Sequence, residues 1–218
     1  DILAGWYAAQ MGLPAGHFVC ASNDNKVLYD FFRTGTYDKN RAFHVTVSPS
    51  MDILISSNLE RLLCHMGGQD ATQAEMADLQ TKGIYKADIT DNSISGEYAT
   101  EAETFDAIRT VYQNTGYVMD THTAVAYAAY QKYKAESGSN TPMVIVSTAS
   151  PYKFTKDVMT ALDTAYAQKD AFALMQDLEK VSHVPIPAPI RDLEKKTIRH
   201  KNVCEKTQIR EFVQNWKW

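Results

Sequence analysis

The Met-Val-Ile-Val run at residues 143–146 constrains the fold most, because it leads directly into a helix start. These four residues are apolar without polar alternation, which is typical of a central parallel strand covered by helices on both faces. Ser150 is a suitable N-cap and Pro151 a suitable first residue for the helix that follows. Ligands of open parallel sheets bind at the carboxyl ends of strands, so we expect Ser147 and Thr148 to point into a site.

Strand and helix patterns alternate along the rest of the chain. Thr100 and Glu103 have the spacing of a capping box, and Thr121 is a suitable cap for the next helix. The alternation predicts an α/β fold with a mainly parallel sheet and helices on both faces. Besides 143–146, we expect strands at 17–22, 41–47, 84–89 and 117–119, and helices at 1–9, 26–33, 53–66, 71–82, 100–112, 121–134, 151–162 and 170–180.

The pattern also predicts how the chain is organised. Residues 1–68 and 100–183 carry the regular alternation and should form the main domain. Residues 69–99 are more polar and less regular, so we expect an inserted segment or lobe there. Residues 184–218 begin with three prolines in a short stretch, which predicts an extended tail followed by a terminal helix.

Composition argues against several classes of function. A net charge of -4 and a pI near 5.9 argue against a nucleic-acid-binding surface, which is usually basic. The three cysteines lie far apart without zinc-ligand spacing, so we expect no metal site. The sequence shows neither a leader pattern nor an apolar run of about 18 residues, which favours a cytoplasmic protein without a membrane segment. Because the chain starts at a helix cap without Met, we read it as a piece whose upstream part is missing.

Three segments carry candidate site residues. Asp1 lies at a helix N-terminus, whose free amides suit a phosphate, and Asn23 follows a predicted strand. Ser147 and Thr148 follow another, where a hydroxyl can bond a heterocycle nitrogen. Each has a structural alternative: a plain cap, a turn residue, or a hydroxyl bonded to the local backbone. His122, at a helix start, suits either a catalytic base or a structural histidine, and the structural reading is favoured.

Several blocks of sequence closely resemble threonine synthases of the longer bacterial and fungal type. They keep the family's order over nearly the whole chain, and the fifteen-residue block at 48–62 (Ser-Pro-Ser-Met-Asp-Ile-Leu-Ile-Ser-Ser-Asn-Leu-Glu-Arg-Leu) is the most specific. The other blocks are residues 1–5 (Asp-Ile-Leu-Ala-Gly), 21–23, 30–37, 116–125 (Gly-Tyr-Val-Met-Asp-Thr-His-Thr-Ala-Val) and 147–154.

This resemblance implies a pyridoxal-phosphate enzyme of fold type II, the tryptophan-synthase-β fold. Such an enzyme converts O-phospho-L-homoserine and water to L-threonine and phosphate. The family's Schiff-base lysine lies in a Ser-Phe-Lys-Asp motif that is absent here, so we expect no catalytic residue in this chain. We therefore expect the isolated chain to be inactive and without cofactor, its partner to be the missing N-terminal half, and its uncovered faces to favour self-association.

The resemblance also assigns roles to individual residues. Asp1 matches the end of the family's Gly-Asn-Phe-Gly-Asp loop, which holds the cofactor phosphate, and Thr148 matches the residue that faces the pyridine nitrogen, with Ser147 beside it. Candidate contacts to the substrate are Asn23, Asn58, Arg61 and Lys153.

Two positions depart from the family pattern. Thr121 stands where the family commonly has Pro, and Ser150 where it has His, so any side-chain role there is open. Two alternatives to a threonine synthase remain: another fold-type-II lyase or dehydratase, or a catalytically silent ligand-binding domain.

Overall fold

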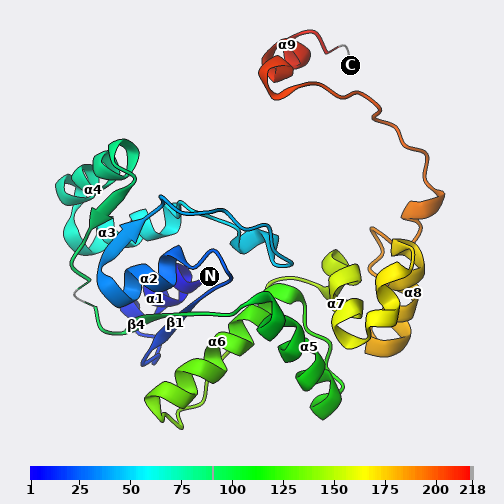
Figure 1. Ribbon diagram of the computed structural model, residues 1–218, viewed down its shortest axis with the longest axis horizontal. Coiled ribbons are helices and arrows are strands. Elements are labelled where there is room, and N and C mark those ends of the chain that lie inside the picture. Colours follow the sequence, from blue (N-terminus) through cyan, green and yellow to red (C-terminus); the bar gives the residue numbers. More distant parts are fainter. Residues whose placement is uncertain (90, 217–218) are drawn as a thin grey trace. The chain divides into compact units, whose positions relative to one another are not determined.

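The computed structural model describes residues 1–89 and 91–216, in two compact units, Asp1–Val184 and Pro185–Trp218 (Figure 1). The first unit alternates helices with short strands. Its elements in order are α1 (Ile2–Gln10), β1 (Phe18–Ser22), α2 (Val27–Thr34), β2 (Thr36–Asp38), η1 (Pro49–Met51), α3 (Ser57–Gly67), α4 (Gln69–Thr81), β3 (Ile84–Lys86), β4 (Ile94–Tyr98), α5 (Glu101–Thr115), α6 (Thr121–Ser137), η2 (Pro151–Phe154), α7 (Thr155–Leu162), η3 (Thr164–Gln168) and α8 (Ala171–Ser182).

Strands β1 and β4 form a parallel pair in which Cys20 lies opposite Gly96. Helices α2 and α6 both pack on this pair, from opposite faces (Figure 1). Successive side chains of a strand point to opposite faces of the sheet, so neighbouring residues of β4 meet different helices. Gly96 faces Tyr29 of α2. The neighbouring Ser95 bonds His17, and the His17 ring stacks on Tyr133 of α6. A parallel pair covered on both faces confirms the predicted α/β fold.

Gly96 is required by the close approach of α2 to β4. A Cβ at this position would lie 2.8 Å from the Cα of Tyr29 and 3.2 Å from the Cβ of Phe32. We expect Gly96→Ala to lower the free energy of unfolding by about 2 kcal/mol, because the helix backbone must move away. Chemical denaturation measures this change. Gly67→Ala is the control: its new Cβ would meet only Ala71 Cβ, at 3.8 Å, so an equal loss there would contradict the explanation.

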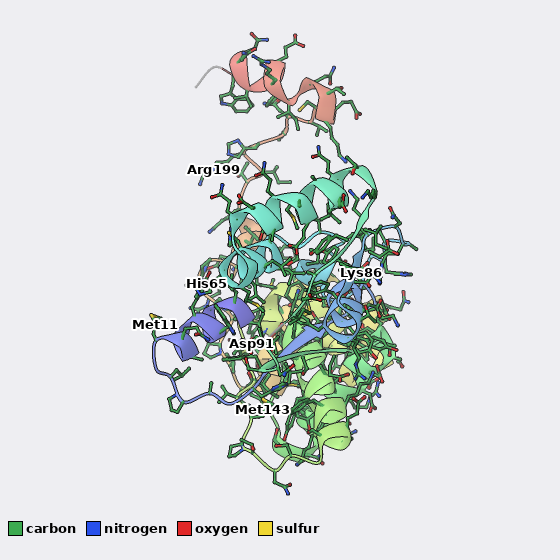
Figure 2. All side chains as sticks on the ribbon, turned by 90° about the vertical axis from the view of Figure 1, so that its left-hand side faces the viewer. Met11, His65, Lys86, Asp91, Met143 and Arg199 are labelled. Atoms are coloured by element: carbon green, nitrogen blue, oxygen red, sulfur yellow. The ribbon has the colours of Figure 1, made fainter. Side chains whose placement is uncertain are left out.

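Strands β2 and β3 form a separate antiparallel pair that carries one side of the main core. Tyr37 and Tyr85 lie opposite each other in the register, and their rings stack at 5.1 Å. Asp91, labelled in Figure 2, accepts the Trp6 indole N–H at 2.6 Å and ties α1 to the segment before β4. The buried members of this core are Trp6, Val27, Phe31, Tyr37, Leu59, Leu62, Leu63, Leu79, Tyr85 and Ile94.

The helix caps follow the sequence closely, with one correction. Thr100 and Glu103 form the predicted capping box of α5, and Ser150 accepts from Tyr152 N as the predicted cap, although it starts the 3₁₀ helix η2. The cap of α6 was predicted one residue too late: Asp120, not Thr121, accepts the first-turn amides. A carboxylate accepts more bonds than a hydroxyl, and Asp120 uses this capacity.

Three predicted strands do not form. Residues 41–47, 117–119 and 143–146 lie outside the strands, because none of them finds a neighbouring strand in the described part of the chain. The strand predicted at 84–89 is shorter, Ile84–Lys86. The sequence analysis missed β4, which lies within the supposed insertion at 69–99 yet pairs with β1. The proposed segment boundaries stay predictions.

The second unit, beginning at Pro185, consists mainly of turns and extended chain. Arg191 donates to the Ile186 carbonyl oxygen at 3.0 Å, and the helical pieces are η4 (Leu193–Lys195), η5 (Lys206–Gln208) and α9 (Ile209–Gln214). Across residues 1–89 and 91–216, no helix is long and apolar enough to cross a membrane.

Candidate functional site

A chain of hydrogen bonds runs from the start of α6 to Ser147. Asp120 accepts from the backbone amide of His122 at 2.9 Å and from that of Thr123 at 3.3 Å. The Thr123 hydroxyl donates to the other oxygen of the same carboxylate, and Thr123 Oγ1 lies 2.9 Å from Ser147 Oγ. The chain therefore joins a fully buried carboxylate to an exposed hydroxyl.

The direction of these bonds follows from counting protons. Thr123 has one hydroxyl hydrogen, and the ionised carboxylate of Asp120 can only accept, so this hydrogen goes to Asp120. The 2.9 Å contact to Ser147 also has Thr123 Oγ1 as its donor, so the same hydrogen is shared between Asp120 and Ser147. Ser147 accepts in this contact, which leaves its own hydroxyl hydrogen to be donated at the exposed end of the chain.

Asp120 stays ionised in this setting. Burial opposes the charged form, but hydrogen bonds from the side chains and backbone amides of His122 and Thr123 outweigh it and hold the pKa of Asp120 below its usual range. The negative charge makes Asp120 an acceptor for the Thr123 hydroxyl at neutral pH.

His122 joins this cluster to a second loop. Its Nε2 accepts the backbone N–H of Ser50 at 3.0 Å, and its ring packs against Phe154 at a centroid distance of 4.7 Å. In the neutral ring the hydrogen is then on Nδ1, which lies 3.3 Å from Asp120 Oδ1. His122 is buried and bonded at both nitrogens, which is the arrangement of the structural histidine that the sequence favoured.

The loop that carries Ser50 is held by a buried polar network. Asn23 donates to Asp52 at 2.7 Å and to the hydroxyl oxygen of Ser48 at 3.0 Å, while its own carbonyl oxygen accepts the Asn25 amide at 2.9 Å. Asp52 also accepts the Thr46 hydroxyl at 2.7 Å and the Thr46 backbone amide at 3.0 Å. The segment following β1 is thereby fixed to the loop that reaches His122.

The structure brings together only part of the predicted site. Ser147 joins the α6 cluster directly, and Asn23 reaches it through the 46–52 loop. Thr148 is exposed beside Ser147. Asp1 caps α1 without a side-chain bond, and among the described residues no hydrogen bond joins it to Ser147.

The remaining substrate candidates lie elsewhere on the surface. Arg61 donates to Asn58 at 3.0 Å on the exposed side of α3, and Lys153 is exposed on η2. Their proposed roles, and those of Asp1, Ser147 and Thr148, stay predictions. Within residues 1–89 and 91–216, no group of three or more His, Cys, Asp or Glu could hold a metal ion.

Sequence reasoning missed four residues that build this cluster. They are Ser50, Asp52, Asp120 and Thr123. A signal was available only for Asp120, which precedes a helix as a good N-cap. The others act through partners that are distant in the sequence.

Known proteins match this chain over most of its length. A family model described as "Threonine synthase, C-terminal" matches residues 123–213. A "Threonine synthase-like 1" from Mus musculus is 35% identical over 232 residues, covering 99% of this chain and 31% of that protein. The threonine synthase of Saccharomyces cerevisiae is 34% identical over 206 residues, covering 84% of this chain and 40% of that protein.

Solved structures agree. A "PLP bound Threonine synthase from Brucella melitensis" has a TM-score of 0.72 at 31% identity, covering 90% of this chain and 39% of that one. A yeast threonine synthase structure has a TM-score of 0.75 at 29% identity, covering 90% of this chain and 41% of that one.

The fold is thus that of pyridoxal-phosphate-dependent α/β enzymes. Within that class, the chain belongs to the threonine synthase family and corresponds to a C-terminal portion of it. It spans 31% of the mouse relative and 40% of the yeast one.

Proposed function

We propose that this chain supplies the C-terminal portion of a threonine synthase, which converts O-phospho-L-homoserine and water to L-threonine and phosphate. The rest of the enzyme would supply the Schiff-base lysine, because the family motif that carries it is absent from this sequence. The observation that carries the proposal is the hydroxyl chain from Asp120 to Ser147, of which Thr123 and Ser147 lie in the region that the family model matches.

The donor set of this cluster fits pyridoxal phosphate. When bound, the cofactor supplies an electron sink for bonds broken at the amino acid substrate. Ser147 and Thr148 each present an exposed hydroxyl that can donate a hydrogen bond to an unprotonated ring nitrogen. The first-turn amides of α1 behind Asp1 remain free of a side-chain cap, as a phosphate site requires.

The polar network assigns Asn23 a positioning role in this proposal. Its amide hydrogens and carbonyl oxygen are used within the protein, by Asp52, Ser48 and Asn25. It therefore acts on a substrate through the 46–52 loop. Arg61 and Lys153 keep exposed cationic groups, which suit a carboxylate or phosphate of the substrate.

A complementation experiment tests this function. The chain is co-expressed with the part of yeast threonine synthase that it does not match, and phosphate release from O-phospho-L-homoserine is measured with pyridoxal phosphate present. We expect release from the complex and none from either part alone. We also expect borohydride to fix no stoichiometric cofactor on a lysine of this chain. Release by the isolated chain, or an assembled complex without release, would contradict the proposal.

A further inference from the structure

A cavity of about 260 Å³ lies between residues 152–157 and the start of α8. Helices α7 and α8 pack against each other in the first unit (Figure 1). Tyr152, Phe154 and Met175 give the cavity an apolar lining. Its volume lies just below the range of about 300–1,000 Å³ that is typical of drug-sized ligands. The cavity therefore suits a small molecule with an apolar part.

Three charged residues line the same cavity, namely Lys153, Lys156 and Asp157. Both lysines are exposed, and Asp157 is partly buried. Among residues 1–89 and 91–216, none of these three side chains finds a hydrogen bond or an ion pair. Two cations and one carboxylate thus face one cavity without direct partners.

The carboxylate of Asp157 lacks the contacts that normally compensate burial. Burial raises its pKa, and the positive charge of Lys156 offsets only part of this effect. Partly buried carboxylates are normally stabilised by hydrogen-bond donors, and here a molecule in the cavity would have to supply them. An ammonium group suits this position, because it offers three N–H donors and a positive charge.

The two lysines require the opposite chemistry. Their ammonium groups bind carboxylates and phosphates as point charges. A simple anion would satisfy Lys153 and Lys156 but would place a like charge near Asp157, and a simple amine would do the reverse. A molecule that carries both a carboxylate and an ammonium group satisfies all three side chains.

The cavity is separate from the hydroxyl chain of the candidate site, since neither Asp120 nor Ser147 lines it. Phe154 connects the two, because its ring also packs against His122 at a centroid distance of 4.7 Å. Lys153 is already a candidate contact to the substrate. The test therefore relies on Lys156 and Asp157, to which no other role is assigned.

We propose that this cavity binds a small α-amino acid with an apolar side chain. Asp157 would accept hydrogen bonds from its ammonium group, and Lys153 and Lys156 would hold its carboxylate. The apolar lining would contact its side chain. This site does not depend on the proposed function, because its residues all belong to this chain and binding is measured without turnover.

Titration calorimetry of the isolated chain with L-leucine tests this inference. Isocaproate and isoamylamine are the analogues of L-leucine that lack the ammonium group and the carboxylate. We expect one L-leucine per chain, bound at least about tenfold more tightly than either analogue, because each analogue loses a charge-assisted contact. We expect Asp157→Asn to weaken L-leucine at least about tenfold. Lys156→Gln should weaken it about two- to fivefold, because this charge is exposed to solvent.

Asp70→Asn is the matched control, since Asp70 is an exposed carboxylate in the first turn of α4 and does not line the cavity. It should bind L-leucine as the wild-type chain does. Asp157→Asn should not lower the unfolding temperature, because its carboxylate has no hydrogen bond to lose. L-leucine should raise the unfolding temperature of the wild-type chain more than that of Asp157→Asn.

Three results would overturn the amino-acid site: no binding of L-leucine at millimolar concentration, equal affinity for either analogue, or equal weakening by Asp70→Asn and Asp157→Asn. Equal affinity for isocaproate would identify a simple anion site instead. The two analogues test both charges on the unchanged chain, independently of any variant.

Discussion

Replacing Asp52 with alanine is expected to lower the free energy of unfolding by about 3–5 kcal/mol. The carboxylate accepts hydrogen bonds from Asn23, Asn25 and both the hydroxyl and the amide of Thr46. Asn23 and Asn25 are buried, so their amide hydrogens would lose an acceptor without gaining water. Chemical denaturation with a constant dependence on denaturant concentration measures the loss.

Asp163→Ala provides the control for this prediction. Asp163 is an exposed carboxylate that accepts one backbone amide, from Ala165 at 2.8 Å. Water can replace that bond, so we expect a loss of about 1 kcal/mol or less. Equal losses in the two variants would show that the number of buried donors around Asp52 does not determine its contribution.

Local signals predicted the helices well. The Thr100–Glu103 box marks the start of α5 correctly, because caps depend on residues three or four apart. The cap of α6 was placed at Thr121 rather than Asp120, since adjacent good caps cannot be ranked without the partners of their side chains.

Strands were predicted less well, because a strand forms only when it pairs with another strand, and its own sequence does not indicate which segment that is. Residues 143–146 have strand composition but pair with no strand among residues 1–89 and 91–216, whereas β4 pairs with β1 despite containing Gly96 and Glu97. Tertiary contacts explain why these two residues, which are unfavourable in a strand, occur in β4. Gly96 allows the close approach of α2, and the buried Glu97 accepts a hydrogen bond from Arg33 at 2.8 Å. These contacts override strand propensity.

Part of the hydrogen-bonded cluster could be reached from the sequence, whereas most of its contacts could not. The end of the 143–146 run led to Ser147, and its hydroxyl does join a buried cluster. The bond between Ser50 and His122 crosses 72 residues, and no spacing in the sequence could indicate it.

Replacing Asp120 with alanine is expected to cost about 3–4 kcal/mol of unfolding free energy. The change removes the cap of α6 and leaves the first-turn amides of His122 and Thr123 without an acceptor in a buried position. It also frees the Thr123 hydroxyl that orients Ser147. Denaturation curves measure the loss, and a change within about 0.5 kcal/mol of zero would contradict this account.

Asp120→Asn separates the cap from the charge. Asn is as good an N-cap as Asp, so this variant should lose less than half of what Asp120→Ala loses. Its amide group would donate to Thr123 Oγ1, so the Thr123 hydrogen would no longer be shared with residue 120 and would go to Ser147 alone. The folded pKa of Asp120 is depressed, so the stability that its charge adds is complete above its unfolded pKa, about 3.9. That contribution is lost as the pH falls from there through the folded pKa. The stability gap between the wild-type chain and Asp120→Asn should therefore narrow on acidification below about pH 4. A gap that widens there would mean that the carboxylate is not the ionised end of the chain.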